Sequence, residues 1–207
     1  MRKLALITGA SAGIGAEFAR HYAERGVDLV LTARREDRLQ ALASELRDAF
    51  GVDVYVLRAD LSLPASPKQL IDELEQRKRH VDILINNAGW DERCSIEEMT
   101  PQFWDLAQGI NLKAYFFACQ HVVAGMRAAG GGSIVNFSSI SYMMGNAGYP
   151  VYTTANSGIN GMTRSLAREF GPENIRVNAI APGWVLTQKQ KDMWVTPEGL
   201  AAHIDRQ

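Results

Sequence analysis

The stretch "LALITGASAGIG", Leu4 to Gly15, decides the fold of this chain. A short apolar run leads directly into the glycine-rich turn "TGASAGIG", and residues 16–26 that follow have the composition of a helix. Glycines let the backbone turn tightly and approach a phosphate closely, and a helix N-terminus offers unpaired N–H groups to an anion. Between a first strand and a first helix, this pattern predicts a dinucleotide-phosphate site rather than a glycine turn that binds nothing.

Apolar runs and helical patterns then alternate along the rest of the chain. The runs are rich in Val, Ile and Leu without clean alternation, which is typical of strands buried on both faces of a parallel sheet. The alternation predicts right-handed crossovers and a three-layered, doubly wound α/β fold of the Rossmann type. Because no repeat or linker appears, residues 1–207 are predicted to form a single NAD(P)-binding domain. The six predicted strands cover residues 4–8, 28–33, 52–57, 81–86, 133–137 and 176–181.

Four further segments have apolar residues at helical spacing. The first predicts a helix whose buried stripe consists of Leu39, Leu42, Ala43, Leu46 and Phe50. The others lie within residues 67–79, 101–129 and 151–170, and "GPEN" at 171–174 ends the last one.

Composition excludes several classes of protein. The chain has 207 residues, 46% hydrophobic and 22% charged, and its 22 basic and 23 acidic residues nearly cancel, so neither a nucleic-acid nor a membrane partner is predicted. The N-terminal apolar stretch is too short for a signal peptide, and no stretch reaches the length of a membrane span. With no secretory signal, Cys94 and Cys119 are expected to be free thiols in a reducing compartment, which indicates the cytoplasm.

The second predicted strand ends in "LTARR", with Arg34 and Arg35 where an NAD site would have an acidic residue. No carboxylate appears before Glu36. A guanidinium here can pair with a 2′-phosphate, so NADP is favoured over NAD. The other interpretation is that both arginines are solvated charges in the first turn of a helix.

Several motifs in the same order along the chain resemble those of the short-chain dehydrogenase/reductase family. They are "TGASAGIG" (8–15), "ADLS" (59–62), "NNAG" (86–89), Asn111 within "GINLKAYFF", Ser139 within "VNFSSIS", Tyr152 thirteen residues later, and "APGWVLT" (181–187). The resemblance covers nearly the whole chain and implies an alcohol/carbonyl oxidoreductase that uses a nicotinamide cofactor and has no metal site. By the same resemblance, the cofactor-binding residues are Gly9, Ser11, Gly13, Ile14, Gly15, Arg34, Arg35, Asp60, Leu61, Asn87, Ala88, Gly89, Tyr152, Pro182, Gly183, Val185 and Thr187.

The resemblance also assigns catalytic roles to Ser139, Tyr152, Asn111 and Asn156. Reduction of a carbonyl needs a hydride on carbon and a proton on oxygen; Tyr152 would transfer the proton, while Ser139 would hydrogen-bond the oxygen. A phenol has a pKa of about 10 and is a poor base near neutrality. The family normally lowers that pKa with a lysine four residues later, which also binds ribose and continues a proton relay through Asn111. Here that position is Asn156, which carries no positive charge.

Two functions therefore remain open from the sequence. One is an NADP(H)-dependent oxidoreductase of alcohols, sugars or polyols whose activity is weakened by Asn156. The other is an inactive cofactor-binding variant, a pseudoenzyme or an engineered scaffold on the same fold. A pocket lined by aromatic and methionine side chains would suit sugar faces and hydrophobic ketones equally; the candidates, each of which could also simply pack in its loop, are Trp90, Met143, Met144, Tyr149, Trp184 and Trp194.

The resemblance also implies a seventh strand after the sixth, but residues 188–207 contain no further apolar run. Six strands are therefore expected, with the sixth at an edge of the sheet. A shortened chain, a covering partner copy or an open edge would each account for this pattern. The family also implies a homodimer or homotetramer that pairs through helices 112–128 and 152–170.

Overall fold

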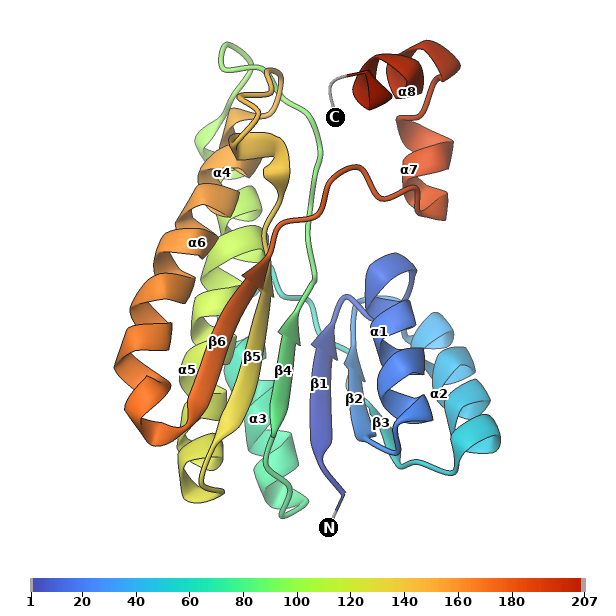
Figure 1. Cartoon of the computed structure of the whole chain (residues 1–207), viewed down its shortest axis with the longest axis vertical. Helices are drawn as coiled ribbons and strands as arrows, with labels where there is room; N and C mark the ends of the chain where they lie inside the picture. The colour runs from blue at the N-terminus through green and yellow to red at the C-terminus, as the bar shows by residue number, and fades with distance from the viewer. Residues whose placement is uncertain (1, 206–207) are drawn as a thin grey trace.

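A computed structural model describes residues 2–205 and contains one six-stranded, fully parallel sheet (Figure 1). The strands lie in the order β3-β2-β1-β4-β5-β6, so β1 and β4 are neighbours at the point where the strand order reverses. The predicted doubly wound sheet is confirmed, and each predicted strand end lies within two residues of its observed position. The strands are β1 (Leu4–Thr8), β2 (Asp28–Thr32), β3 (Val54–Val56), β4 (Ile83–Asn86), β5 (Gly132–Phe137) and β6 (Ile175–Ile180).

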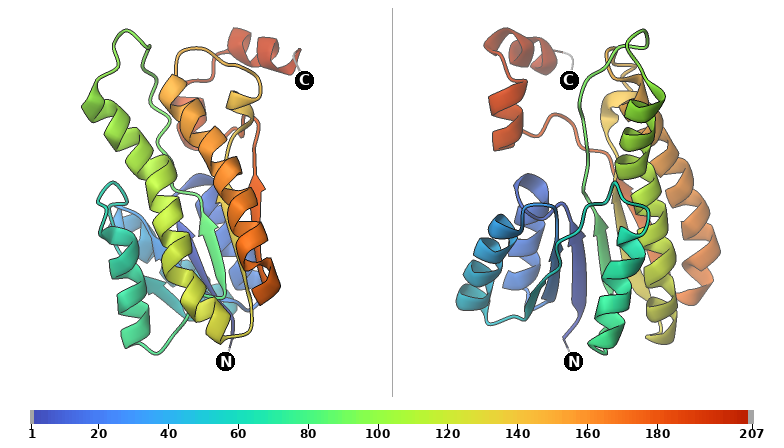
Figure 2. Two further views of the ribbon diagram at one scale, coloured as in Figure 1. Left: turned by 90° about the vertical axis from the view of Figure 1, so that its left-hand side faces the viewer. Right: turned by 180° about the vertical axis from the view of Figure 1, so that it is seen from behind.

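Helices cover the sheet from both sides, which gives the predicted three layers (Figures 1 and 2). On one face lie α1 (Gly13–Glu24) and α2 (Glu36–Phe50). On the other lie α3 (Ser66–Gln76), α5 (Ala114–Ala128) and α6 (Pro150–Phe170), with α4 (Pro101–Gln108) before α5. Two short helices, α7 (Gln188–Met193) and α8 (Pro197–Ile204), lie beyond the carboxyl ends of the strands.

The central strand β1 contributes to the core on both of its faces. Leu4 and Leu6 pack with residues of α3 and α5, whereas Ala5 and Ile7 pack with residues of α1 and α2. Successive side chains of a strand point to opposite faces, so a strand with helices on both sides must be apolar at every position. This explains the unbroken apolar run at the beginning of the sequence.

Buried amides connect the middle of the sheet to α6. The Asn86 side chain at the end of β4 donates to Asn136 Oδ1 on β5 (2.9 Å), and Asn136 Nδ2 donates to Thr163 Oγ1 on α6 (3.0 Å). All three side chains are buried. Because buried polar groups are costly unless they are hydrogen-bonded, this chain of contacts fixes α6 relative to β4 and β5.

Three details differ from the sequence-based predictions. Phe50 is 42% exposed rather than buried, because α2 ends there and the chain leaves the helix through Gly51 in a left-handed conformation (φ +63°). The pattern at 101–129 is divided into α4 and α5 by a π-helical turn, Gly109–Lys113. Helices α7 and α8 were not predicted, because neither has a repeated apolar stripe.

Cys94 and Cys119 are both free, as expected. Across residues 2–205, none of the helices combines the length and apolarity needed to cross a bilayer.

Replacement of Leu84 by Ala should lower the free energy of unfolding by about 2–5 kcal/mol, because this fully buried side chain of β4 would leave a cavity. Leu63→Ala is the matched control, since Leu63 is 58% exposed and its truncation should change stability by less than about 0.5 kcal/mol. Urea denaturation followed by circular dichroism measures both. Equal losses in the two variants would contradict the described core.

Candidate active site

The carboxyl ends of β1 and β4 are joined by a pair of reciprocal hydrogen bonds. Thr8 Oγ1 accepts from the backbone N–H groups of Asn87 (2.9 Å) and Ala88 (3.0 Å). In return, the Asn87 side chain donates to the Thr8 carbonyl oxygen (2.9 Å). The glycine turn after β1 and the "NNAG" segment after β4 are therefore held as one unit.

Two glycines of the turn are required by this contact itself. A Cβ on Gly9 would lie 2.8 Å from Ala88 Cα, and one on Gly15 would lie 2.6 Å from Asn87 Nδ2. Real Cβ atoms do not approach other atoms so closely, so any side chain would force the two segments apart. The sequence suggested that these glycines make room for a phosphate, and the structure shows that they also make room for Asn87 and Ala88.

The N-terminus of α1 has the properties expected of an anion site. Ala12 at the N-cap has no side chain that could bond the free N–H groups, and the first turn has no acidic residue. Gly13, which begins the helix, has a positive φ of +57°. The first N–H groups of the helix therefore have no side-chain acceptor at the N-cap, which fits a cofactor pyrophosphate.

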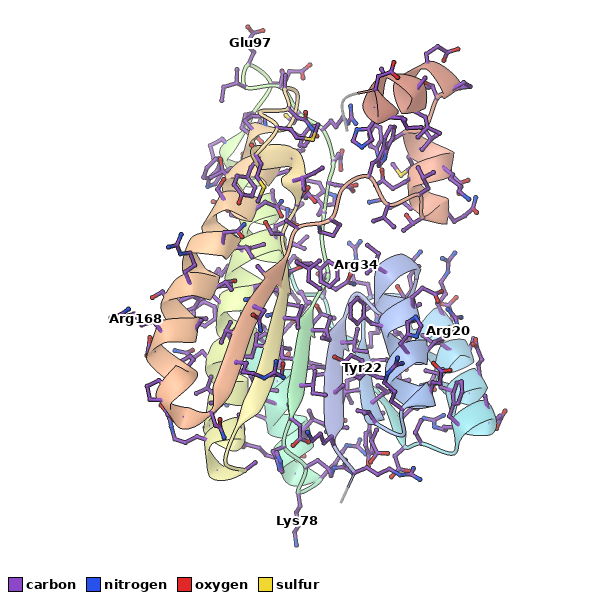
Figure 3. All side chains as sticks on the ribbon, viewed as in Figure 1. Arg20, Tyr22, Arg34, Lys78, Glu97 and Arg168 are labelled. Atoms are coloured by element: carbon purple, nitrogen blue, oxygen red, sulfur yellow. The ribbon has the colours of Figure 1, made fainter. Side chains whose placement is uncertain are left out.

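Cations gather beyond the end of β2. The Arg35 guanidinium donates to Ser11 Oγ (3.0 Å), and Arg34 is exposed at the carboxyl-end side of the sheet (Figure 3). Burial and the nearby positive charges of Arg38 and Arg34 lower the pKa of Arg35. Crowded guanidinium groups of this kind favour a bound anion.

Asp60 lies after β3, near the same group of cations. Its carboxylate accepts from the backbone N–H (3.0 Å) and the hydroxyl (2.8 Å) of Ser62. The Ser62 N–H lowers the pKa of Asp60, and the charge of Arg34 lowers it further, so the carboxylate is ionised at neutral pH.

A cavity of about 660 Å³ brings together many, but not all, of the predicted site residues. It is lined by Ser139, Tyr152, Asn111, Asn156, Ile14, Asn87, Gly89, Pro182, Gly183, Val185 and Thr187. The predicted residues that do not line it are Gly9, Ser11, Gly13, Gly15, Arg34, Arg35, Asp60, Leu61 and Ala88, which belong to the turn after β1 and to the segments that follow β2, β3 and β4. The cavity thus contains all four predicted catalytic residues, whereas most residues predicted to bind the phosphates and the adenosine lie outside it.

A small hydrogen-bond network places Ser139 and Tyr152 on the same cavity. Ser138 Oγ, directly after β5, donates to the backbone carbonyl of Asn156 on α6 (3.0 Å). Asn160 Nδ2 donates to Ser138 Oγ (2.7 Å) and to the same carbonyl (2.9 Å). Sequence analysis missed Ser138 and Asn160, whose only signal was a second serine beside Ser139 and an amide one turn after Asn156.

Comparison with known proteins identifies the family of this chain. The family model for short-chain dehydrogenases matches residues 3–197. The chain belongs to the short-chain dehydrogenase family.

Individual relatives are similar over most of their length. The probable galactose dehydrogenase of Rhizobium meliloti (strain 1021) is 38% identical over 202 residues, which cover 98% of this chain and 79% of the relative. The D-xylose 1-dehydrogenase of Caulobacter vibrioides (strain NA1000 / CB15N) is 38% identical over 205 residues, 99% of this chain and 80% of the relative. The crystal structure of L-sorbose reductase from Gluconobacter frateurii, in complex with NADPH and L-sorbose, has a TM-score of 0.88 and 32% identity, and the match covers 96% of this chain and 79% of that one.

The Tyr152 phenol lies in an environment that opposes its ionisation. Burial raises the pKa of Tyr152 above its ordinary value of about 10, and the charge of Asp91 raises it further. Hydrogen bonding with the Ser139 and Asn156 side chains acts in the opposite direction but does not cancel the effect of burial. The phenol is therefore protonated at neutral pH.

Asn156, at the position where the family resemblance predicts a lysine, lines the cavity. Its side chain is 3% exposed, and its Nδ2 donates to the backbone carbonyl of Tyr152 (2.8 Å), an ordinary contact between residues one helical turn apart. No lysine lines the cavity among residues 2–205. The site therefore contains no ammonium group that could stabilise a Tyr152 anion.

Asn111 is held by the loop after β4. It lies in the π-helical turn between α4 and α5, where its Oδ1 accepts from the Trp90 N–H (2.7 Å) and its Nδ2 donates to the Trp90 carbonyl (2.8 Å). Turns of this type are frequent at functional sites. The side chain lines the cavity, but its polar atoms are already engaged with Trp90.

The aromatic pocket is formed by only part of the predicted set. Met144, Tyr149, Trp184 and Trp194 line the cavity. Trp90 does not; its ring packs on Phe103 with 4.7 Å between centroids. Met143 does not line it either and is 59% exposed.

Gly15→Ala should lower the free energy of unfolding by about 1–3 kcal/mol and weaken NADPH binding, because the new Cβ forces the glycine turn away from Asn87. Gly161→Ala on α6 is the control, since its Cβ would meet open space and Ala is the better helix former by about 0.5–1 kcal/mol. Thermal unfolding and NADPH fluorescence titration measure both effects. A Gly15→Ala protein that is as stable as the parent would show that the described contact is wrong.

Proposed function

We propose that this protein interconverts an alcohol of the sugar or polyol type and the corresponding carbonyl compound, with NADP(H) as cofactor. The observation that carries the proposal is the presence of Ser139 and Tyr152 on one cavity, at the carboxyl ends of the strands and next to an uncapped helix N-terminus. Ligands of open α/β sheets bind at this edge, where the strand order reverses. Membership of the short-chain dehydrogenase family supports the same reaction class.

In this proposal Tyr152 and Ser139 act on the substrate oxygen. The protonated phenol of Tyr152 donates a proton to the carbonyl oxygen during reduction and accepts it back during oxidation. The Ser139 hydroxyl hydrogen-bonds the same oxygen and stabilises the charge that develops there. The Ser138–Asn160 contacts hold both groups in place.

The cofactor, when bound, would supply or accept the hydride. The first turn of α1 and the glycine turn would hold its pyrophosphate, and Asp60 and Leu61 would lie at its adenine. Asn87, Ala88, Gly89 and the segment from Pro182 to Thr187 would border its nicotinamide half. A Cβ on Gly13 would lie 3.3 Å from the Thr187 side chain, so these two parts of the site already face one another.

A preference for NADP over NAD is supported by the cations after β2. Arg34 and Arg35 are exposed, and Arg35 lies next to Ser11 of the glycine turn. A guanidinium at this place can form paired hydrogen bonds with a 2′-phosphate.

Asn156 supports a weakened enzyme and, as the second candidate, a cofactor-binding protein without turnover. The cavity lacks a lysine, and the pKa of Tyr152 is raised rather than lowered. Either condition disfavours the tyrosinate that the oxidative direction requires.

We also propose that copies of the chain pair through α5 and α6. Phe116 on α5 is 45% exposed and stacks edge-on against Phe117, so this helix presents aromatic surface to the outside. Light scattering that finds a stable monomer at micromolar concentration would remove this proposal.

Asn156→Lys should raise the rate of carbonyl reduction by at least about tenfold, because an ammonium beside Tyr152 stabilises its anion. The Ser138 network uses the backbone carbonyl of residue 156, so the fold should be retained. NADPH fluorescence titration of both proteins, followed by assays on a panel of sugars and ketones, tests the whole proposal. Failure of both proteins to bind NADPH or NADH at millimolar concentration would refute it, and turnover by the lysine variant alone would favour the second candidate for this chain.

The rate of alcohol oxidation should rise with pH between about pH 7 and pH 10, because the ionised fraction of Tyr152 increases below its raised pKa. Carbonyl reduction needs the protonated phenol and should be insensitive to pH over the same range. Steady-state pH profiles of kcat/KM in both directions check this, with Tyr152→Phe as the inactive control. An oxidation rate that levels off near pH 7 would contradict the raised pKa.

A further inference from the structure

The cavity contains a charged side chain, Arg93, that forms no ion pair within the described part of the chain. A carboxylate, a guanidinium and an imidazole line it, from Asp91, Arg93 and His203 respectively. Asp91 forms an ion pair with Lys189 and accepts from Gln190 Nε2 (2.9 Å), so its charge is balanced. His203 packs against the Trp184 ring. Arg93, in contrast, has no carboxylate within ion-pair distance among residues 2–205.

Arg93 is nevertheless held in a defined position. Its guanidinium carbon lies 4.8 Å from the ring centroid of Trp194 and 5.4 Å from that of Tyr149. Contacts of this type fix the plane of the guanidinium and leave its N–H groups, which point outward in that plane, free to donate. Two rings on different segments therefore hold an arginine whose N–H groups have no ion-pair acceptor among residues 2–205.

This guanidinium lies close to the reacting groups. The rings of Tyr149 and Tyr152 are 5.7 Å apart between centroids, so one aromatic ring separates Arg93 from the phenol of Tyr152. Arg93, Tyr149, Tyr152 and Ser139 line the same cavity, so a molecule whose carbonyl meets Tyr152 and Ser139 could extend along Tyr149 toward Arg93.

We infer that Arg93 binds a carboxylate at the end of the substrate remote from the reacting carbon, and that the substrate is a sugar acid rather than a neutral sugar or an apolar ketone. A carboxylate accepts two parallel N–H bonds from a guanidinium, a geometry that a hydroxyl cannot provide. An apolar substrate would cover the charged group without pairing it, which is unfavourable. This inference rests on the proposed function, because it assigns the substrate of the same site.

D-gluconate and D-glucitol test the inference directly, since they differ only in a carboxylate against a hydroxymethyl group. Trp194 contacts Arg93, so its fluorescence should report binding without any turnover. The parent protein should bind gluconate more tightly than glucitol by on the order of tenfold, and Arg93→Gln should abolish this preference while leaving glucitol affinity unchanged. Because Arg93 is exposed, the preference should also shrink when the salt concentration is raised.

Lys191→Gln is the matched control, because it removes one positive charge from α7 at an exposed residue that does not line the cavity. It should keep the preference for gluconate. Equal affinity of the parent for both probes would overturn the inference, as would an Arg93→Gln variant that loses affinity for both in parallel, since that result would mean that Arg93 only holds Trp194 in place. NADPH binding and turnover are measured separately, so a protein that prefers gluconate but never turns over would refute the proposed activity and leave the carboxylate site standing.

Discussion

The contact between Thr8 and Asn87 is the constraint on which the rest of the site depends. It joins the two central strands where their order reverses, and it places the glycine turn, the start of α1 and the loop after β4 within reach of one ligand. The Ala88 backbone and the Asn87 side chain approach the turn so closely that a Cβ at Gly9 or Gly15 would clash with them. One packing requirement inside the protein thus produces both the shape of the phosphate end and the entrance to the cavity.

The reacting end is built on a second, independent support. Ser138 and Ser139 follow strand β5 directly, and Tyr152 lies on helix α6. The buried amides of Asn86 and Asn136 fix this helix relative to the sheet. The groups that set this geometry are hydrogen-bonded and mostly buried. The side chains of α7 and of the loop after β4 that meet across the cavity are instead half-buried or exposed. The groups on β5 and α6 are therefore held rigidly, whereas the side chains of α7 and of the loop after β4 can adjust to a ligand.

Local patterns in the sequence were sufficient for the fold and for part of the cavity lining. Apolar runs predicted all six strands, because strands buried on two faces leave a clear signal. The family resemblance predicted Ser139 and Tyr152 as site residues, and the two do share the cavity. The exposure of Phe50 and the division of the 101–129 helix depend on where each helix ends, which periodicity does not specify. The contacts of Thr8, Ser138 and Arg93 were not predicted, because the partners of these residues lie far away in the sequence. Arg93, for example, meets Tyr149 and Trp194, which only the folded chain brings together.

The way in which residue 156 is held has a consequence for how this protein can evolve. The main-chain carbonyl at this position carries the contacts that join α6 to β5, while the side chain bonds only within its own turn of helix. The side chain at this position can therefore change without loss of the backbone contacts that join α6 to β5. Codons for asparagine and lysine differ by a single nucleotide, so one point mutation in either direction could alter the acid/base group while the scaffold persists. The contacts that join α6 to β5 would therefore be retained whichever side chain stands at this position.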